Sequence, residues 1–250
     1  MFLINGVMKK NKIIFGIIGG AGVASTNLLL KNIEEYFTNN GYDKDFQHPE
    51  MIVFQATKSP SRSLFLEKRG PSFIPSYVEI ANKLNSIGAN IFAMNCNTAH
   101  FAIEEIINKT GLSFINLINE VKKEVDKYNV NNIGLIVSDG CRMGNVYEKI
   151  FTDYNIVYPD IQNQIIVTRG IKNIKNKNRF LENQDENSPH FLFSNVCDHL
   201  VQKNVELIII GCTDISVKFS PTFYKNIKII DSLEVLTNVI IKTHLENEDE

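Results

Sequence analysis

The sequence has no excess of charge of either sign. Its 26 Lys and Arg residues face 28 Asp and Glu residues, which gives a net charge of -2 and a pI of about 6.2. Binding to nucleic acid or to an anionic membrane usually requires a basic excess. We therefore expect no nucleic-acid partner and no membrane partner, and we expect a small-molecule ligand instead.

Cysteines are few, and long apolar runs are missing. None of the four cysteines lies in a CxxC pair, so the sequence predicts neither a disulfide framework nor a zinc site, and this usage is typical of a reducing compartment. No segment approaches the ~18 consecutive apolar residues of a transmembrane helix, and the apolar run at the start is too short for a signal peptide. We expect a cytoplasmic protein, with an unstructured extension at residues 1–12 and an acidic, solvated tail at residues 246–250.

The dinucleotide-binding pattern GxGxxG is also missing. Gly20 and Gly22 are followed by Ser25 where the pattern needs a third glycine, and no acidic residue stands where a ribose would need one. These glycines are instead typical of a tight strand-to-helix turn, with close approach of a ligand as the second interpretation. His100 follows Cys96 at a spacing that two metal ligands can share, but no further ligands cluster nearby. We expect no cofactor and no metal.

The sequence does contain short β-branched runs that alternate with longer segments of helical period. In a chain of 250 residues that is 44% hydrophobic, this pattern predicts parallel strands covered by helices on both faces. Strands are expected at 13–20, 51–56, 90–95, 113–118, 132–138, 156–159 and 206–211, and helices at 25–37, 74–88, 119–128, near 143–153 and at 191–203. The polar stretch 173–189 is expected to be an insertion that forms a mobile loop or lid.

Two strand-end motifs repeat along the chain. GIIGGAG at 16–22 is answered by GLIVSDG at 134–140, and IFAMNCNT, which ends at Thr98, is answered by LIIIGCT, which ends at Thr213. The two offsets nearly coincide, which predicts a duplicated α/β unit whose halves face each other across a pseudo-twofold axis. Because ligands bind beyond the carboxyl ends of parallel strands, a cleft between the halves would carry Cys96 on one wall and Cys212 on the other.

The expected fold is therefore α/β, with two similar domains built on parallel sheets and the active site in the cleft between them. We expect residues 12–115 plus 231–250 to form the domain that carries Cys96. Residues 116–230 are expected to form the domain that carries Cys212.

Two opposed thiols are suited to removing a proton from one face of a carbon and returning a proton to the other face. A thiol, with an ordinary pKa of about 8.5, can be tuned toward neutrality by N–H groups and a nearby cation, so that one cysteine acts as base and the other as acid. Backbone N–H groups at Asn97, Thr98 and Thr213 would hold a carboxylate and stabilise an enolate-like intermediate, each by ~3 kcal/mol. A single buried cysteine is more often a packing residue, and we expect this of Cys197.

Several motifs together resemble the cofactor-independent aspartate/glutamate racemase family. They are GIIGGAG near the start, SPSRS at 59–63, MNCNTAH, GLIVSDG, GCTDIS at 211–216 and the late IDSLEVL. The resemblance runs from about Lys12 to Leu236, and CNTAH with GCT, in that order and at that distance, is its most specific part. It implies a two-domain α/β protein that interconverts the enantiomers of an acidic amino acid without pyridoxal phosphate, and relatives are often homodimers.

The resemblance also implies roles for individual residues. Cys96 and Cys212 would be the two acid/base residues, and Asn97, Thr98 and Thr213 would bind the α-carboxylate. Arg62 would bind the side-chain carboxylate of the substrate. The remaining predicted substrate-binding residues are Gln55, Gly20, Ala21, Ser138 and Lys175, of which Lys175 matches a second cation of the family only across a gap.

The sequence departs from the family at several positions that predict a change in substrate preference. Relatives read Gly-Gly-Met-Gly-Pro where this chain has Ala21 and Val23, and Ser61 replaces the aspartate before the arginine. Asp214 replaces a glutamate, and Asp139 is an added carboxylate that we expect to repel an acidic substrate.

Two alternatives to an aspartate or glutamate racemase stay open. One is a related two-cysteine enzyme, such as a maleate-type cis-trans isomerase or a hydantoin racemase. The other is a ligand-binding homologue that has lost turnover, for which the altered positions 21, 23 and 139 are the only support. The turn that carries Arg62 favours an amino diacid over a hydantoin.

Overall fold

The structure is a computed structural model that describes residues 12–248. The extension expected at residues 1–12 lies outside this range except for its last residue, and the tail expected at 246–250 lies outside it for its last two residues. Residues 246–248 belong to the helix α9 (Ser232–Glu248), and the acidic side chain of Glu246 is exposed there, as expected for this part of the tail. No helix in the described range is long and apolar enough to cross a membrane.

Two parallel sheets with the same internal order form the centre of the molecule. The first has the order β2 (Glu50–Gln55), β1 (Ile14–Gly19), β3 (Ile91–Met94), and all of its strands are parallel. The second begins β5 (Asn155–Val157), β4 (Asn132–Ile136), β6 (Leu207–Ile210) and continues with β8 (Ile227–Asp231) and β7 (Phe223–Tyr224). In both sheets the first strand in the chain lies between the second and third, and only β7 runs antiparallel. The predicted α/β fold with two related halves is confirmed.

Helices cover both sheets. The longer ones are α1 (Val23–Asn39), α3 (Ile74–Ser86), α4 (Ile103–Thr110), α5 (Leu117–Val125), α7 (Ile161–Ile174), α8 (Pro189–Gln202) and α9. Two short helices, α2 (Arg62–Leu66) and α6 (Asp139–Met143), and four 3-10 turns, η1 (Asp45–Gln47), η2 (Asn97–Ala102), η3 (Lys177–Phe180) and η4 (Ile215–Val217), complete the described elements. In α3 the buried residues recur at helical spacing and a proline occupies the first turn, as an amphipathic helix requires.

Two predictions of secondary structure are wrong, and the long helix α7 was not predicted. The segment 113–118 pairs with the first sheet only at Phe114, because the side chain of Asn116 accepts hydrogen bonds from two following N–H groups and starts α5. The helix expected near 143–153 ends as α6 at Met143, and Asn145 takes a positive φ of 49° that a helix does not allow. Helix α7 was not predicted, and it takes up the first part of the expected loop 173–189.

The rest of the 173–189 connection is tied to helix α7. It contains η3 and ends where Pro189 opens α8. The side-chain amide of Asn173 donates to the carbonyl of Asn187 at 2.7 Å, and Arg169 bonds to the side chain of the same residue. Residues 175–188 between α7 and α8 are therefore a long polar connection that is tied to α7 at its base, and its mobility stays a prediction.

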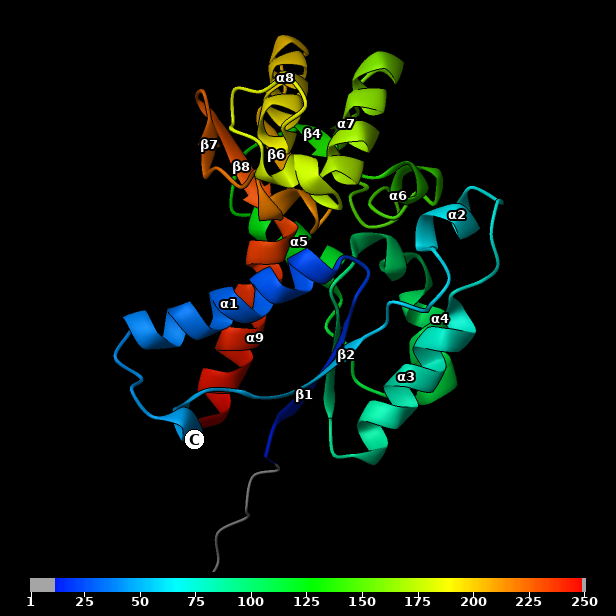
Figure 1. Ribbon diagram of the computed structural model, residues 1–250, viewed down its shortest axis with the longest axis vertical. Helices are drawn as coiled ribbons and strands as arrows, with labels where there is room; N and C mark the ends of the chain where they lie inside the picture. The colour runs from blue at the N-terminus through cyan, green and yellow to red at the C-terminus, as the bar shows by residue number, and fades with distance from the viewer. Residues whose placement is uncertain (1–11, 249–250) are drawn as a thin grey trace, which may run out of the picture.

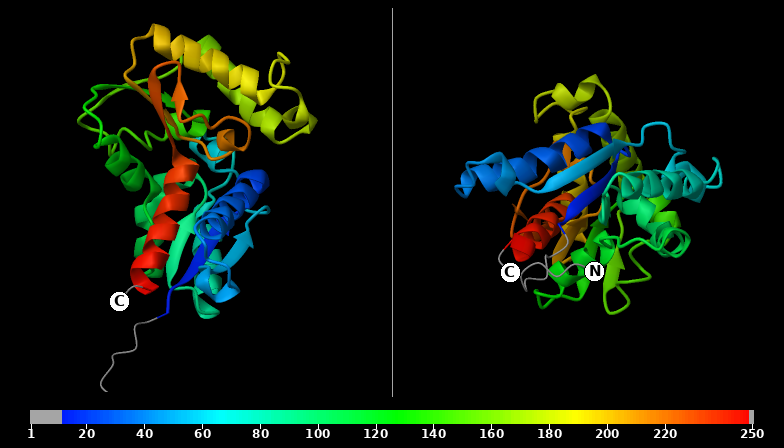
Figure 2. Two further views of the ribbon diagram at one scale, coloured as in Figure 1. Left: turned by 90° about the vertical axis from the view of Figure 1, so that its left-hand side faces the viewer. Right: turned by 90° about the horizontal axis from the view of Figure 1, so that it is seen from below.

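The two halves share one apolar core. It includes Phe15 and Ile17 from β1, Leu135 from β4 and Leu233 and Ile240 from α9. Helix α9 follows β8 of the second sheet but packs against α1 and α5, and Figures 1 and 2 show it in red beside the blue helix α1. A return of residues 231–250 to the first half accords with this packing, although the exact domain boundaries stay a prediction.

Candidate active site

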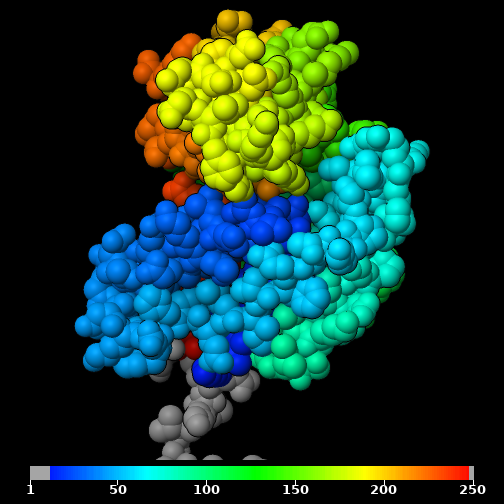
Figure 3. Space-filling view, viewed as in Figure 1, coloured from blue at the N-terminus to red at the C-terminus, as the bar shows by residue number. Residues whose placement is uncertain are grey.

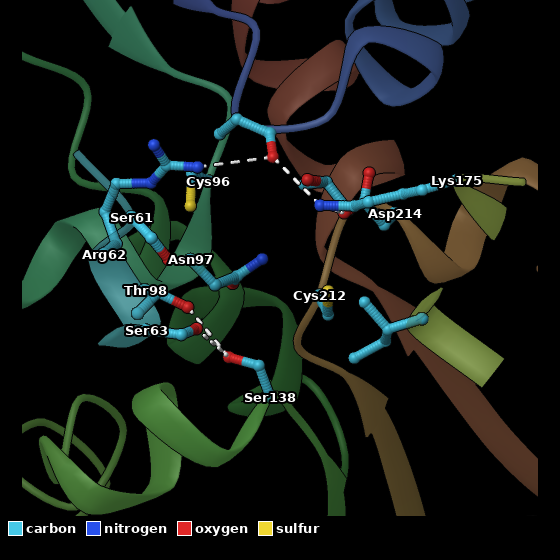
Figure 4. Close-up of a pocket in the computed structure, with 13 residues that line it drawn as sticks. Ser61, Arg62, Ser63, Cys96, Asn97, Thr98, Ser138, Lys175, Cys212 and Asp214 are labelled. Atoms are coloured by element: carbon cyan, nitrogen blue, oxygen red, sulfur yellow. Dashed lines mark hydrogen bonds and ion pairs between the residues drawn. The ribbon is translucent and has the colours of Figure 1, made fainter. Parts of the chain in front are cut away.

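A small cavity of about 90 Å³ lies where the two halves meet. Ligand sites for drug-sized molecules are roughly 300–1,000 Å³, so this one suits a much smaller ligand. Its lining comes from both halves: Ala21, Ser61, Arg62, Ser63, Cys96, Asn97, Thr98, Ser138, Ile171, Lys175, Cys212, Thr213 and Asp214. Figure 4 shows Cys96 and Cys212 on opposite sides of this cavity.

Cys96 lies between the end of β3 and the start of η2, with its backbone extended. The turn that carries it is held by His100, whose Nδ1 lies 2.9 Å from the carbonyl oxygen of Cys96 and whose Nε2 accepts the N–H of Leu117 at 3.1 Å. Since Nε2 accepts, the proton must be on Nδ1, which donates to Cys96. Burial lowers the pKa of His100 to about 4, so this histidine is neutral and positions the turn.

Cys212 occupies the corresponding place after β6. Its carbonyl accepts the N–H of Ile215 at 3.0 Å, which starts η4. Burial, followed by the negative charge of Asp214, raises the pKa of the Cys212 thiol to about 12. Nearby Lys175 opposes this rise only in part. Cys212 is therefore a protonated thiol at neutral pH.

Arg62 is the cation beside Cys96. It is the first residue of α2, and the side chain of Ser61 caps this helix by accepting the N–H of Leu64 at 3.3 Å. Its guanidinium donates to the carbonyls of Pro60 at 3.1 Å and of Ala21 at 3.3 Å, while its buried Nε has no partner within residues 12–248. Burial alone would lower the pKa of Arg62, but Cys96, Tyr77 and Asp214 together raise it.

Lys175 is the second cation, and it is already paired. Its ammonium lies 3.0 Å from Asp214 Oδ2 and donates to the carbonyl of Ala21 at 3.3 Å. Although burial on its inner side would lower it, the pKa of Lys175 is raised, first by Asp214. The lining charges of Lys175 and Asp214 therefore cancel, and Arg62 is the cation of the cavity that has no carboxylate partner within the described residues.

Hydroxyl groups close the other side of the cavity. Ser138 Oγ lies 3.0 Å from Thr98 Oγ1 and accepts a bond from Ser63 Oγ at 3.4 Å. It also accepts the N–H of Cys141 at 3.3 Å and so caps α6. These bonds join the two halves, and Gly140 allows it because a Cβ there would overlap the backbone of Ser63.

The side chains of two expected carboxylate-binding residues, Asn97 and Thr213, form hydrogen bonds within the protein. The amide of Asn97 donates to Ser232 Oγ at 2.8 Å, and its oxygen accepts from Tyr147 at 2.7 Å. Thr213 Oγ1 donates to the carbonyl of Asn95 at 3.3 Å. A ligand would therefore meet the backbone of these two residues.

Most of the predicted site residues line the cavity, but two of them do not. Gln55 is exposed and its side chain donates to Asn27 at 3.5 Å, away from the cavity. Gly20 has a positive φ of 76° and lines a neighbouring chamber instead. Asp139 does not line the cavity, and Gln164 and Thr168 donate to its carboxylate at 2.9 and 2.8 Å; its repulsion of an acidic ligand stays a prediction.

The cavity also contains residues that were not predicted as site residues: Ser61, Ser63, Ile171 and Asp214. The two serines flank Arg62 in the SPSRS motif, and Asp214 directly follows GCT, so proximity to a motif was a usable signal for these three. Ile171 lies on α7 and carries no such signal. In the described part of the chain, no three His, Cys, Asp or Glu side chains are placed to hold a metal ion together.

Comparison with known proteins supports the class of protein that the fold and cavity suggest. The sequence model of the Asp/Glu/Hydantoin racemase family matches residues 18–240. A curated relative, the broad specificity amino-acid racemase RacX of Bacillus subtilis (strain 168), is 23% identical over 92% of this chain and 97% of its own.

Solved structures give the same result. An aspartate racemase from Picrophilus torridus superposes with a TM-score of 0.76 at 27% identity, covering 93% of this chain and 94% of that one. A glutamate racemase from Francisella tularensis, solved with D-glutamate, gives a TM-score of 0.58 at 16% identity over 95% and 82% of the two chains, which is a likeness of fold. The chain belongs to the Asp/Glu/Hydantoin racemase family, and this membership supports an isomerase of the racemase type.

Proposed function

We propose that the protein racemises a small acidic amino acid by a two-base mechanism in which Cys96 and Cys212 are the acid/base residues. The observation that carries this proposal is the position of the two thiols on opposite sides of one small cavity. A substrate carbon held between them has one sulfur on each face, as inversion of its configuration requires.

The proton transfers balance without another reactant. A thiolate on one side removes the α-proton as the electron pair moves into an enolate-like intermediate, and the thiol on the other side returns a proton to the opposite face. The enzyme ends with the two protonation states exchanged, and the opposite enantiomer runs the same steps in reverse.

The charged groups beside the two thiols have opposite signs. The guanidinium of Arg62 interacts with Cys96, whereas Asp214 lies beside Cys212. Cys212, with a pKa of about 12, supplies the thiol. Since one cysteine accepts the α-proton and the other donates the returning proton, this mechanism needs no cofactor.

Substrate binding is assigned to groups around the two thiols. Backbone N–H groups of Asn97, Thr98 and Thr213 would bind the α-carboxylate and stabilise the intermediate. Arg62 would bind the side-chain carboxylate, since its buried Nε has no partner within residues 12–248. Ala21 and Ser138 would contact the ligand as wall residues, whereas Lys175 is held by Asp214.

The test is isotope exchange in deuterated water. The protein is incubated with L-aspartate and, separately, with L-glutamate, while NMR follows loss of the α-proton signal and chiral chromatography follows the D enantiomer. We expect exchange and racemisation together. If no acidic amino acid loses its α-proton, the proposed function is wrong.

The same experiment separates the alternatives. A hydantoin or a cis diacid that turns over when no amino acid does would favour a related two-cysteine isomerase, and binding of an amino acid without exchange would favour an inactive homologue. The cavity volume of about 90 Å³ and the buried guanidinium support an amino diacid over a substituted hydantoin.

We also propose a cytoplasmic protein that forms a homodimer. Four free cysteines support a reducing compartment, and the dimer follows from the family resemblance. Sedimentation equilibrium of the purified protein would test the dimer, and a single species with the mass of one chain would exclude it.

A further inference from the structure

A larger chamber lies directly beside the catalytic cavity. Its volume is about 320 Å³, and its lining is Gly20, Ala21, Gly22, Val23, Ala24, Thr57, Ile174, Lys175, Arg179 and Asp214. Ala21, Lys175 and Asp214 line both spaces. These three residues are therefore the wall between the catalytic cavity and this outer chamber. Figure 3 shows the region, where the yellow atoms of the upper half meet the blue atoms around α1.

The wall is held mainly by the ion pair between Lys175 and Asp214. The two charged groups are 3.0 Å apart, and Lys175 also donates to the carbonyl of Ala21 at 3.3 Å. The side chain of Asp214 is only 8% exposed, while that of Lys175 is 51% exposed. Apart from Ala21, this wall consists of side chains, so rotation about side-chain torsions can open it without a change in the backbone.

The position of Asp214 depends on the absence of a side chain at Gly22. A Cβ at Gly22 would overlap the Asp214 carboxylate. The φ of Gly22 is -146°, which any residue adopts, so space is the reason that glycine is needed here. Asp214 Oδ1 is buried and has no hydrogen-bond partner within residues 12–248. A buried acceptor without a partner raises the free energy of the closed wall, and opening would relieve this.

The outer chamber has the chemistry of a site for the end of an acidic side chain. Val23 and Ile174 give it aliphatic walls, and Thr57 offers a hydroxyl. Arg179 lines it too, and no ion pair of this guanidinium occurs in the part of the chain that the structure describes; its contact is with the ring of the adjacent Phe180. A carboxylate carried on a longer aliphatic stem would match these groups.

We propose that the Lys175–Asp214 pair is a movable partition and that the outer chamber binds the distal carboxylate of amino acids with longer side chains than aspartate. The partition then sets the preference for side-chain length: aspartate reacts with the wall closed, and glutamate or 2-aminoadipate requires it to open. This inference rests on the proposed function, because it names the substrate class that the same catalytic cavity accepts.

The test compares substrates of increasing length in variants that weaken the wall in different ways. Asp214→Ala and Lys175→Ala each remove one member of the pair, and Gly22→Ala pushes Asp214 from the opposite side. Lys172→Ala is the matched control, since this lysine lies one turn earlier on α7 and lines neither space. For each protein, kcat/KM is measured with aspartate, glutamate and 2-aminoadipate.

We expect the ratio of kcat/KM for 2-aminoadipate to that for aspartate to rise about tenfold or more in the wall variants, on the scale of one or two methylene groups in a fitted pocket. The ratio should be unchanged in Lys172→Ala. Adding Arg179→Ala to Asp214→Ala should remove most of the gain. Ratios within twofold of the wild type in correctly folded Asp214→Ala and Lys175→Ala would overturn the partition.

Calorimetric binding of 2-aminoadipate and aspartate to the same proteins keeps the two proposals separable. If the wild type exchanges no α-proton, the proposed function is wrong, and the binding ratios still decide whether the wall controls length. If the wild type is active and the ratios do not move, the partition alone is wrong.

Discussion

The two halves of the molecule have the same strand order but different charges beside their cysteines. Cys96 follows β3 and has the Arg62 guanidinium as its neighbour, whereas Cys212 follows β6 and has the carboxylate of Asp214 nearby. The duplicated framework places the thiols symmetrically, and the charges make them unequal. In each turnover of a two-base racemase one sulfur begins with a proton and the other without one, and the two enantiomers use opposite starting states.

The two halves also differ in the residue that anchors the turn after each cysteine. Four residues after its cysteine, each half has a buried side chain that anchors the turn: His100 accepts the N–H of Leu117 at the start of α5. Ser216 instead donates to Asp231 at 2.7 Å, and Asp231 accepts the N–H of Leu233 in the first turn of α9. The structural role is retained in both halves while the chemical groups differ, so anchoring and catalysis have separate requirements.

The largest effect is expected from removing either thiol. Cys96→Ala and Cys212→Ala should each lower racemisation by about 10³-fold or more, since each direction needs both an acid and a base. Each variant should still exchange the α-proton of one enantiomer, and the two variants should select opposite enantiomers, because each retains the sulfur on one face only. Proton NMR in deuterated water with pure enantiomers measures this.

Cys197→Ala is the control for loss of a thiol. This residue lies on α8, is fully buried in the core and does not line the cavity, so activity per folded molecule should be unchanged. Exchange of the same enantiomer by both active-site variants would contradict placement of the sulfurs on opposite faces.

The two anchors should respond differently to acid. His100 has a folded pKa of about 4 against an ordinary 6.5, so the unfolded chain binds a proton in this range that the folded chain does not. Stability is therefore lost as the pH falls from 6.5 toward 4, by about 3 kcal/mol. Asp231 has a pKa raised by burial, and its contribution is lost in the opposite direction, as the pH rises from the ordinary value.

Urea unfolding at several pH values tests the histidine anchor. His100→Asn should lower stability at pH 7, where the neutral imidazole bonds both Cys96 and Leu117, and should flatten the dependence between pH 6.5 and 4. Ser216→Ala is the matched variant of the other half. It removes a bond that lowers the pKa of Asp231, so it should change the slope in the sense opposite to the histidine effect, with stability lost as the pH rises. An equal slope in the wild type and in His100→Asn would assign the acid sensitivity elsewhere.

A smaller effect is expected from replacing Arg62, the cation beside Cys96. Arg62→Ala should weaken aspartate by about 2 kcal/mol, roughly 30-fold in kcat/KM, through loss of a charge-assisted contact. Arg62→Lys should recover part of it. An amino acid without a side-chain carboxylate should be affected much less, and an equal loss for alanine and aspartate would mean that Arg62 does not bind the side chain.

The smallest effect tests the charge beside Cys212. Asp214→Asn removes the second cause of the raised pKa of Cys212, so that pKa should fall. Alkylation by iodoacetamide at pH 8 in a Cys96→Ala background should become faster, because the thiolate is the reactive form. An unchanged rate would show that burial alone sets this pKa.

Strand ends and motifs allowed most of the site to be predicted from the sequence. The repeated glycine and cysteine motifs predicted both thiols in one cavity, because parallel strands bring their carboxyl ends to one edge, and the family resemblance added Arg62 and Ser138, which line the same cavity. Gln55 ends β2 but does not line this cavity, since a motif does not tell to which face of a strand a side chain points. Asp139 lies outside the lining as well, because Gln164 and Thr168 bond to it from α7, a helix that was not predicted.

Helix α7 could not be found from periodicity because its pattern is partly inverted. Gln164 and Asn173 are buried on it, while Ile161 and Ile165 are 77% and 58% exposed. Gly170 packs against Phe193 of α8, where a Cβ would overlap the ring. Because polar residues are buried and apolar residues are exposed on this helix, the spacing of hydrophobic residues does not indicate it. The burial of these polar residues is explained only by the residues they contact in the folded chain.

Helix α9 has a consequence for how the protein is made. It follows every strand that the structure describes, yet Leu233, Leu236 and Ile240 belong to the core that they share with Phe15 and Leu29. During synthesis, which proceeds at about 5–20 residues per second, α1 and α5 are translated before the helix that packs against them. Their apolar faces therefore stay exposed to water until α9 has been made.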